Sequence, residues 1–148
     1  MSRSPDELLK HVAVRCREAL IAYRGVRGSL FLTFPHGTCD FASFILGRVL
    51  EQCWGIETTY VVGSKHPSLA SNQCHVWLEA QGFVLDITHE QFENTGLMGS
   101  VFVLDSKWHG QFANHDRRAV EFPGHPAFFP AEELDAALTA CCPPPFPT

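Results

Sequence analysis

The chain has 148 residues, 45% of them hydrophobic, and a formal net charge of −5. This length and apolar content suffice for one hydrophobic core, so we expect a single domain over residues 1–148 that ends in a proline-rich tail at about 141–148. The eleven Lys and Arg residues are scattered rather than gathered into a basic stripe, which argues against a nucleic-acid partner.

The composition also bears on location and on the state of the thiols. No stretch approaches the roughly 20 apolar residues that span a bilayer, and the opening residues MSRSPDELLKH predict a polar helix rather than a signal sequence. We therefore expect a cytoplasmic protein without membrane association, and delivery as an effector is equally compatible with the sequence. Six cysteines in a domain of this size indicate reduced thiols rather than a disulfide framework. Cys141 and Cys142, adjacent at the start of the tail, are expected to be incidental.

Two helices are expected in the first third of the chain. Residues 4–7, Ser-Pro-Asp-Glu, predict a capping box, and apolar residues at three-to-four spacing continue that helix to Tyr23. A second helix is predicted over residues 39–53, and its wide apolar face indicates that it is mostly buried. The connection at 29–36 is expected to contain a short strand at 30–34.

The sequence then becomes typical of β-structure. Runs rich in Thr, Val, Tyr and Ile predict strands at 56–63, 74–80, 83–88 and 101–105, separated by irregular loops at 64–73 and 89–100. The His-, Pro- and Phe-rich region 108–130 has no pattern that assigns it to a helix, a strand or a loop, and 131–140 predicts a short terminal helix. Histidines expected on the surface or in loops are His11, His66, His89, His109, His115 and His125. Aromatic residues expected in the core are Phe102, Phe112, Phe128 and Phe129.

Cys39 is expected at the first position of the second helix, with Thr38 as its N-cap. A helix N-terminus favours the thiolate form of a cysteine, and the thiolate is the nucleophile. Free cysteines are nevertheless among the most buried residues, so this position by itself does not distinguish a nucleophile from packing.

The segment CHVWLEAQGFVLDITHEQF, residues 74–92, predicts a β-hairpin that would supply the other groups of a nucleophilic site. If residues 81–82 form a two-residue turn, or 80–83 a four-residue one, Trp77 faces Asp86 across the hairpin. His75, Trp77 and Asp86 then share one face, with Asp86 diagonal to His75 at a Cβ separation of roughly 7 Å or less. A three-residue loop would put Asp86 on the opposite face. The geometry predicts Cys39 as nucleophile, His75 as base and Asp86 as the group that orients His75.

These motifs resemble the transglutaminase-like branch of the papain-like cysteine protease superfamily. In that branch a helix carries the Cys, a His-Ala-Trp-Val-Glu type strand follows, and an Asp-Pro-Thr or Asp-Ile-Thr type strand comes next. The matching residues here are Cys39, His75-Val76-Trp77-Leu78-Glu79 and Asp86-Ile87-Thr88, within residues 39–92.

The resemblance implies an α+β, papain-like or transglutaminase-like fold in which the Cys helix packs on an antiparallel sheet. It also implies a Cys-His-Asp catalytic triad carried by Cys39, His75 and Asp86, and the activity of a thiol-nucleophile hydrolase or acyltransferase. Members act as peptidases, amidases, deamidases or cross-linking transglutaminases through a thioester. Some members have lost activity, so the alternative is an idle fold that serves as a protein-binding module.

Two departures from the family pattern concern the oxyanion site. The usual Gly-Xaa-Cys-Trp context reads Gly-Thr-Cys-Asp at residues 37–40, and Thr33 stands where papain-like proteins have a Gln. The Cys39 amide is one expected donor, and the weaker candidates for a second are His36, Asn72 and Gln73. Trp77, on the face of His75, is expected to shield the site, with simple packing as the alternative, and it is a further weak candidate for substrate binding.

A metal site is the remaining alternative. His36, Cys39, Cys74 and His75 together offer four nitrogen and sulfur ligands. Neighbouring strand residues point to opposite faces, so Cys74 and His75 are poorly placed to bind one ion, and the spacing is not that of a usual zinc site. We therefore expect no metal. A thiol mechanism needs no cofactor, so we expect none. The expected substrate is a protein or peptide.

Overall fold

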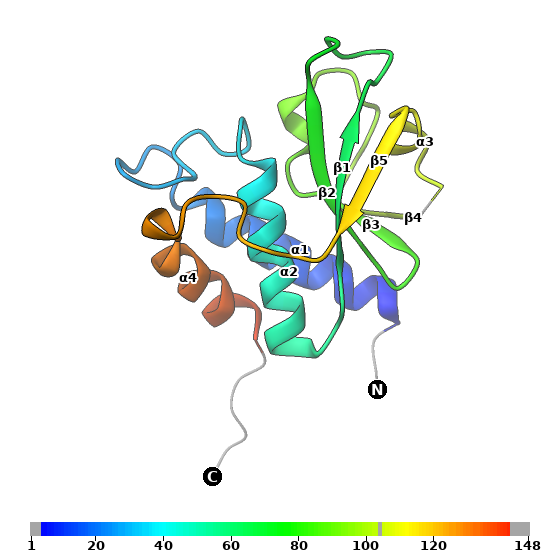
Figure 1. The fold of residues 1–148 in the computed structure, drawn as a ribbon. Helices are drawn as coiled ribbons and strands as arrows, with labels where there is room; N and C mark the ends of the chain where they lie inside the picture. Colours follow the sequence, from blue (N-terminus) through cyan, green and yellow to red (C-terminus); the bar gives the residue numbers. More distant parts are fainter. Residues whose placement is uncertain (1–3, 104, 143–148) are drawn as a thin grey trace.

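The computed structural model describes residues 4–103 and 105–142 and has an α+β architecture (Figure 1). The helices are α1 (Pro5–Ile21), α2 (Cys39–Trp54), α3 (Lys107–Gly110) and α4 (Ala131–Cys141), with 3-10 turns η1 (His89–Gln91) and η2 (Pro126–Phe128). The strands are β1 (Thr59–Ser64), β2 (Cys74–Ala80), β3 (Phe83–Leu85), β4 (Val101–Val103) and β5 (Asn114–Arg118). Among the described residues, no helix has both the length and the apolar character to cross a membrane.

The two predicted N-terminal helices are present, but neither is capped as expected. The Ser4 hydroxyl donates to the Asp6 carboxylate at 2.7 Å instead of accepting a backbone N–H, so the capping box does not form. Thr38 does precede α2, yet its hydroxyl donates to the Pro35 carbonyl at 3.2 Å. The Thr38 side chain therefore does not cap the free backbone N–H groups in the first turn of α2.

The five strands form one antiparallel sheet in the order β4-β3-β2-β1-β5. Ala80 pairs with Phe83 and Leu78 with Leu85, so Gln81 and Gly82 form the two-residue turn that the sequence predicted. Both turn residues have positive φ, 52° and 84°, as a type I′ turn requires. The predicted hairpin is confirmed, with a third strand that ends at Leu85 rather than at residue 88.

Alternation along β2 divides the core between the two faces of the sheet. Val76, Leu78 and Ala80 join the large cluster beneath α1 and α2, the helices that cover one face of the sheet, while α4 packs on these two helices (Figure 1). Trp77 belongs to a second cluster on the other face, with Trp108 of α3 and Phe112. The residue parity that places His75 with Trp77 therefore directs His75 toward the α3 side.

The region 106–130 contains structure that the sequence did not reveal. It supplies α3, the edge strand β5 and the turn η2, whereas the strand expected at 30–34 is a series of turns. β5 reads Asn-His-Asp-Arg-Arg and is largely exposed, so it carries neither the apolar alternation nor the β-branched residues of a half-buried strand. Phe112 is buried as expected, but Phe128 and Phe129 are 69% and 40% exposed.

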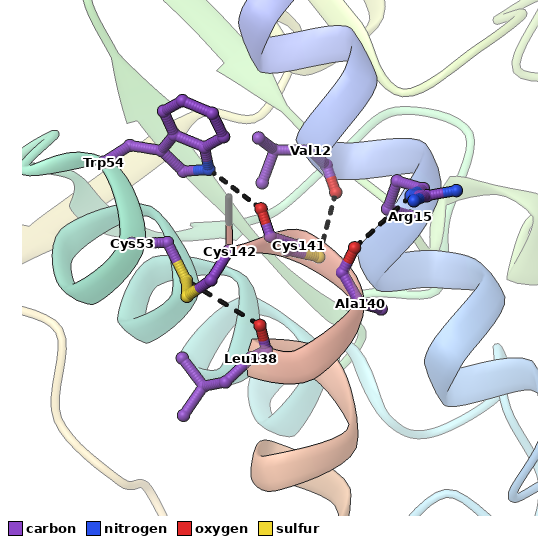
Figure 2. Close-up of a disulfide and its surroundings, with 8 residues drawn as sticks. All are labelled: Val12, Arg15, Cys53, Trp54, Leu138, Ala140, Cys141 and Cys142. Atoms are coloured by element: carbon purple, nitrogen blue, oxygen red, sulfur yellow. Dashed lines mark hydrogen bonds between the residues drawn. A yellow bond between two sulfur atoms is a disulfide. The ribbon is translucent and has the colours of Figure 1, made fainter. Parts of the chain in front are cut away.

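Cys53 and Cys142 form a disulfide between the last turn of α2 and the residue after α4 (Figure 2). The expectation of reduced thiols is wrong for this pair, and Cys142 is not incidental. Folding brings the two residues, 89 positions apart, to a Cα separation of 4.7 Å, a contact that spacing alone does not predict. The adjoining Trp54 indole donates to the Cys141 carbonyl at 3.1 Å, and the Cys141 thiol donates to the Val12 carbonyl. The free cysteines of the described chain are Cys16, Cys39, Cys74 and Cys141.

Candidate active site

Cys39 is the first residue of α2, and α2 is fixed against the strand that carries His75. One turn into the helix, the Ser43 hydroxyl donates to the Val76 carbonyl at 3.4 Å. Cys39 is half-buried and free, and it lies close enough to His75 to contribute to the raised pKa of the imidazole. The Cys39 thiol therefore lies at a helix N-terminus, beside an imidazole.

His75 and Asp86 form the diagonal pair that the hairpin geometry predicted. Nε2 of His75 lies 2.6 Å from Oδ2 of Asp86, and both side chains are fully buried. Because the carboxylate accepts, Nε2 carries a proton, which leaves Nδ1 as the nitrogen available to other groups of the site. The structure thus brings together the three residues that the sequence predicted as a triad.

The electrostatics of the pair favour an imidazolium beside a carboxylate. Burial would lower the pKa of His75, but the charge and hydrogen bond of Asp86, with a smaller effect of Cys39, raise it from 6.5 to about 9. Burial would raise the pKa of Asp86, yet the His75 charge and the hydrogen bonds from His109 and His75 hold it well below its usual range. At neutral pH the site therefore holds a protonated His75.

The shifted pKa of His75 predicts a pH dependence of stability. The folded value of about 9 exceeds the ordinary 6.5, so the stabilisation is complete below about pH 6.5 and is lost as the pH rises through 9. We expect the free energy of unfolding to fall over this range by up to about 3 kcal/mol. Urea unfolding at both ends of the range measures this. Asp86→Asn, which removes the carboxylate charge, should flatten the dependence, and an unchanged slope in that variant would contradict the assignment.

Both carboxylate oxygens of Asp86 accept hydrogen bonds. Oδ1 accepts from the Thr88 backbone N–H at 3.0 Å, and Oδ2 accepts from His109 Nε2 at 2.7 Å as well as from His75. His109 was expected on the surface or in a loop, but it is only 2% exposed. His66 and His89 are buried too, and each bonds a backbone carbonyl. None of the three is on the surface, although His66 does lie in a loop, between β1 and β2.

Gln91 is a further residue of the site that the sequence did not indicate. Its Oε1 accepts from the Gly37 N–H at 3.4 Å, in the loop that precedes Cys39, and its Nε2 lies 3.2 Å from His75 Nδ1. Gln91 therefore connects the nucleophile's loop with the imidazole. Its only sequence signal was its place in the irregular stretch after Asp86, five residues downstream, and this stretch forms η1.

The weaker predicted site residues do not converge on the triad. His36, Asn72 and Gln73 are exposed, and Gln73 accepts locally from the Ala70 N–H at 2.8 Å. Trp77 is fully buried beside His75, with a ring-centroid separation of 5.9 Å, and packs on Phe112. Trp77 can shield the buried side of the imidazole, but as placed it cannot contact a substrate from solvent.

Three side chains of the site could form either a metal site or a hydrogen-bonded cluster. His75, Asp86 and His109 present nitrogen and oxygen atoms within 4.8 Å of one another, a spacing that could in principle hold a metal ion. Both Nε2 atoms already donate to one carboxylate oxygen, at 2.6 and 2.7 Å. An ion at this point would have to break both hydrogen bonds within a fully buried cluster, so we interpret these three side chains as hydrogen-bonding partners.

Comparison of the chain with protein-family models, with curated proteins and with solved structures finds no significant match. The fold and the site therefore have to be interpreted from their own geometry. That geometry is an α+β fold in which a helix-start thiol, a buried imidazole and a buried carboxylate meet.

Proposed function

We propose that the protein is a cysteine-dependent amide hydrolase or acyltransferase of the transglutaminase-like, papain-like type. One observation carries the proposal. His75 hydrogen-bonds a fully buried Asp86 at 2.6 Å, and it lies close enough to Cys39, the first residue of a helix, for the thiol to contribute to its raised pKa. A nucleophile, a base and an orienting group in this order are the parts that covalent acyl transfer needs.

The proposed reaction has two halves. Cys39 sulfur attacks the carbonyl carbon of an amide, a C–S bond forms, and the protonated His75 gives its proton to the departing ammonia or amine. The resulting thioester is then attacked by water or by another amine, from which His75 takes a proton, and the thiol is released. Water gives peptidase, amidase or deamidase chemistry, and an amine gives a cross-link.

Two donors are available for the oxyanion. The backbone N–H of Cys39 is at the helix N-terminus, where N–H groups lack helical partners. The Gln91 amide is a better candidate for the second donor than His36, Asn72 or Gln73, because it lies between His75 and the loop that leads to Cys39. A peptide or protein amide remains the substrate class we propose.

An acylation assay tests this function without knowledge of the substrate. We expect p-nitrophenyl acetate to acetylate Cys39, read as an intact-mass increase mapped to that residue, and to be turned over catalytically. Cys39→Ala should abolish turnover, while Cys74→Ala, which removes another free and more exposed thiol, should leave it intact. Acetylation of Cys74 in preference to Cys39 would favour the idle binding module.

Glutamine-containing peptides then distinguish the possible reactions. Mass spectrometry after incubation with and without a primary amine separates deamidation, amine incorporation with loss of ammonia, and cleavage of the backbone. We expect one of these products with the wild-type chain and none with Cys39→Ala.

A further inference from the structure

His109 reaches the site from α3, a segment outside the predicted triad. Its Nε2 lies 2.7 Å from Oδ2 of Asp86, and its Nδ1 lies 2.7 Å from the hydroxyl of Ser106, the residue before α3. All three side chains are buried. A histidine with both ring nitrogens engaged in a buried network is held in one orientation and one tautomer.

The protonation pattern of this network follows from its acceptor. The Asp86 carboxylate can only accept, so both His75 and His109 present N–H groups to the same oxygen. A neutral His109 then has a lone pair on Nδ1, which accepts from the Ser106 hydroxyl. His109 is fixed from its sides as well, since Trp77 and Phe102 lie at ring-centroid distances of 4.9 and 5.7 Å.

Asp86 consequently has little freedom to move away from His75. Its other oxygen is held by Thr88, and rotation of the carboxylate would break the bonds to both Thr88 and His109. The titratable groups around this carboxylate are the two histidines, and the groups that face His75 on its other side are Cys39 and Gln91.

We propose that His109 is a positioning residue that fixes Asp86 against His75, so that Cys39, His75, Asp86 and His109 work as one hydrogen-bonded unit. The inference rests on the proposed function, and it adds α3 to the elements that the chemistry requires. His109 acts only through Asp86 and His75, and it touches no substrate.

The proposal is tested with His109→Phe and His109→Gln in the full chain. Phe keeps the ring volume but removes both nitrogens, whereas the Gln side-chain N–H can still donate to Asp86. We expect His109→Phe to lower kcat for p-nitrophenyl acetate by roughly tenfold or more with KM little changed. We expect His109→Gln to restore most of the loss.

A second readout separates positioning from a general structural role. Without His109, the carboxylate charge is no longer shared between two donors, so the pKa of His75 should rise by roughly half a unit or more. The alkaline limit of kcat should move up with it. NMR titration of the His75 ring measures the same shift without any activity. A His109→Phe variant that loses thermal stability but keeps the wild-type kcat and His75 titration would overturn the proposal.

Ser106→Ala covers the case in which His109→Phe does not fold. It removes the hydroxyl that fixes His109 Nδ1, so we expect a smaller upward shift in the His75 titration, whereas His109→Gln should titrate close to the wild type. A Ser106→Ala variant with no shift at all would overturn the proposal. If wild-type protein is never acylated at Cys39, the proposed function fails. The His75 titration still decides whether His109 controls Asp86.

Discussion

Near pH 6, iodoacetamide will alkylate Cys39 about tenfold faster than Cys74 or more, and His75→Ala will remove the difference. Access alone favours Cys74, which is exposed, over the half-buried Cys39. An ordinary thiol with a pKa of about 8.5 is less than about 1% ionised at this pH. Cys39 lies beside an imidazole whose pKa of about 9 keeps it charged near pH 6. Under the proposed function, a thiolate paired with that imidazolium is the species that reacts with iodoacetamide.

The chain provides its own controls for this measurement. Cys16 and Cys141 are buried and Cys53 is in the disulfide, so peptide mapping should show little label on them. His75→Phe retains a ring at a fully buried position and separates loss of the base from collapse of the site. If Cys74 reacts faster than Cys39, or if Cys39 reacts equally without His75, the thiol is not activated and the triad is idle.

The part of the site that the sequence predicts is the part set by local geometry. One two-residue turn at Gln81 and Gly82 determines the register of β2 and β3, and register determines which side chains share a face. His75 and Asp86 are only eleven positions apart, so a single correct turn assignment is enough to bring them together. Cys39 at the start of α2 follows in the same way from helical periodicity.

The rest of the site depends on contacts that no local pattern encodes. His109 meets Asp86 across 23 residues, from a four-residue helix too short to show a periodic pattern. Gln91 meets Gly37 across 54 residues through an irregular turn. Cys53 and Cys142 are farther apart still. Their spacing does not indicate a bond, and a protein expected in a reducing compartment is expected to have free thiols. In each case the tertiary fold, rather than the neighbouring sequence, places the second partner.

Loss of the Cys53–Cys142 disulfide will destabilise the protein by about 4 kcal/mol, the second large effect we expect. The bond closes a loop with a sequence separation of 89, and the loop-closure model assigns its greatest stabilisation to long loops. For a chain of this length such a loss corresponds to a fall in Tm of roughly 10–15 °C. Denaturant unfolding of the wild type and of Cys53→Ser/Cys142→Ser measures it.

The same variant should leave the site intact below its unfolding transition. The disulfide lies at the C-terminal end of α2 and Cys39 at its N-terminal end, about 21 Å away along the helix. Alkylation of Cys39 in the folded variant is therefore expected to match the wild type. Reductant should lower the wild-type Tm to that of the double variant, and should not change the variant further. Cys74→Ser, at an exposed free thiol, serves as the neutral substitution. Equal stability of the wild type with and without reductant would show that the two sulfurs are not bonded in solution.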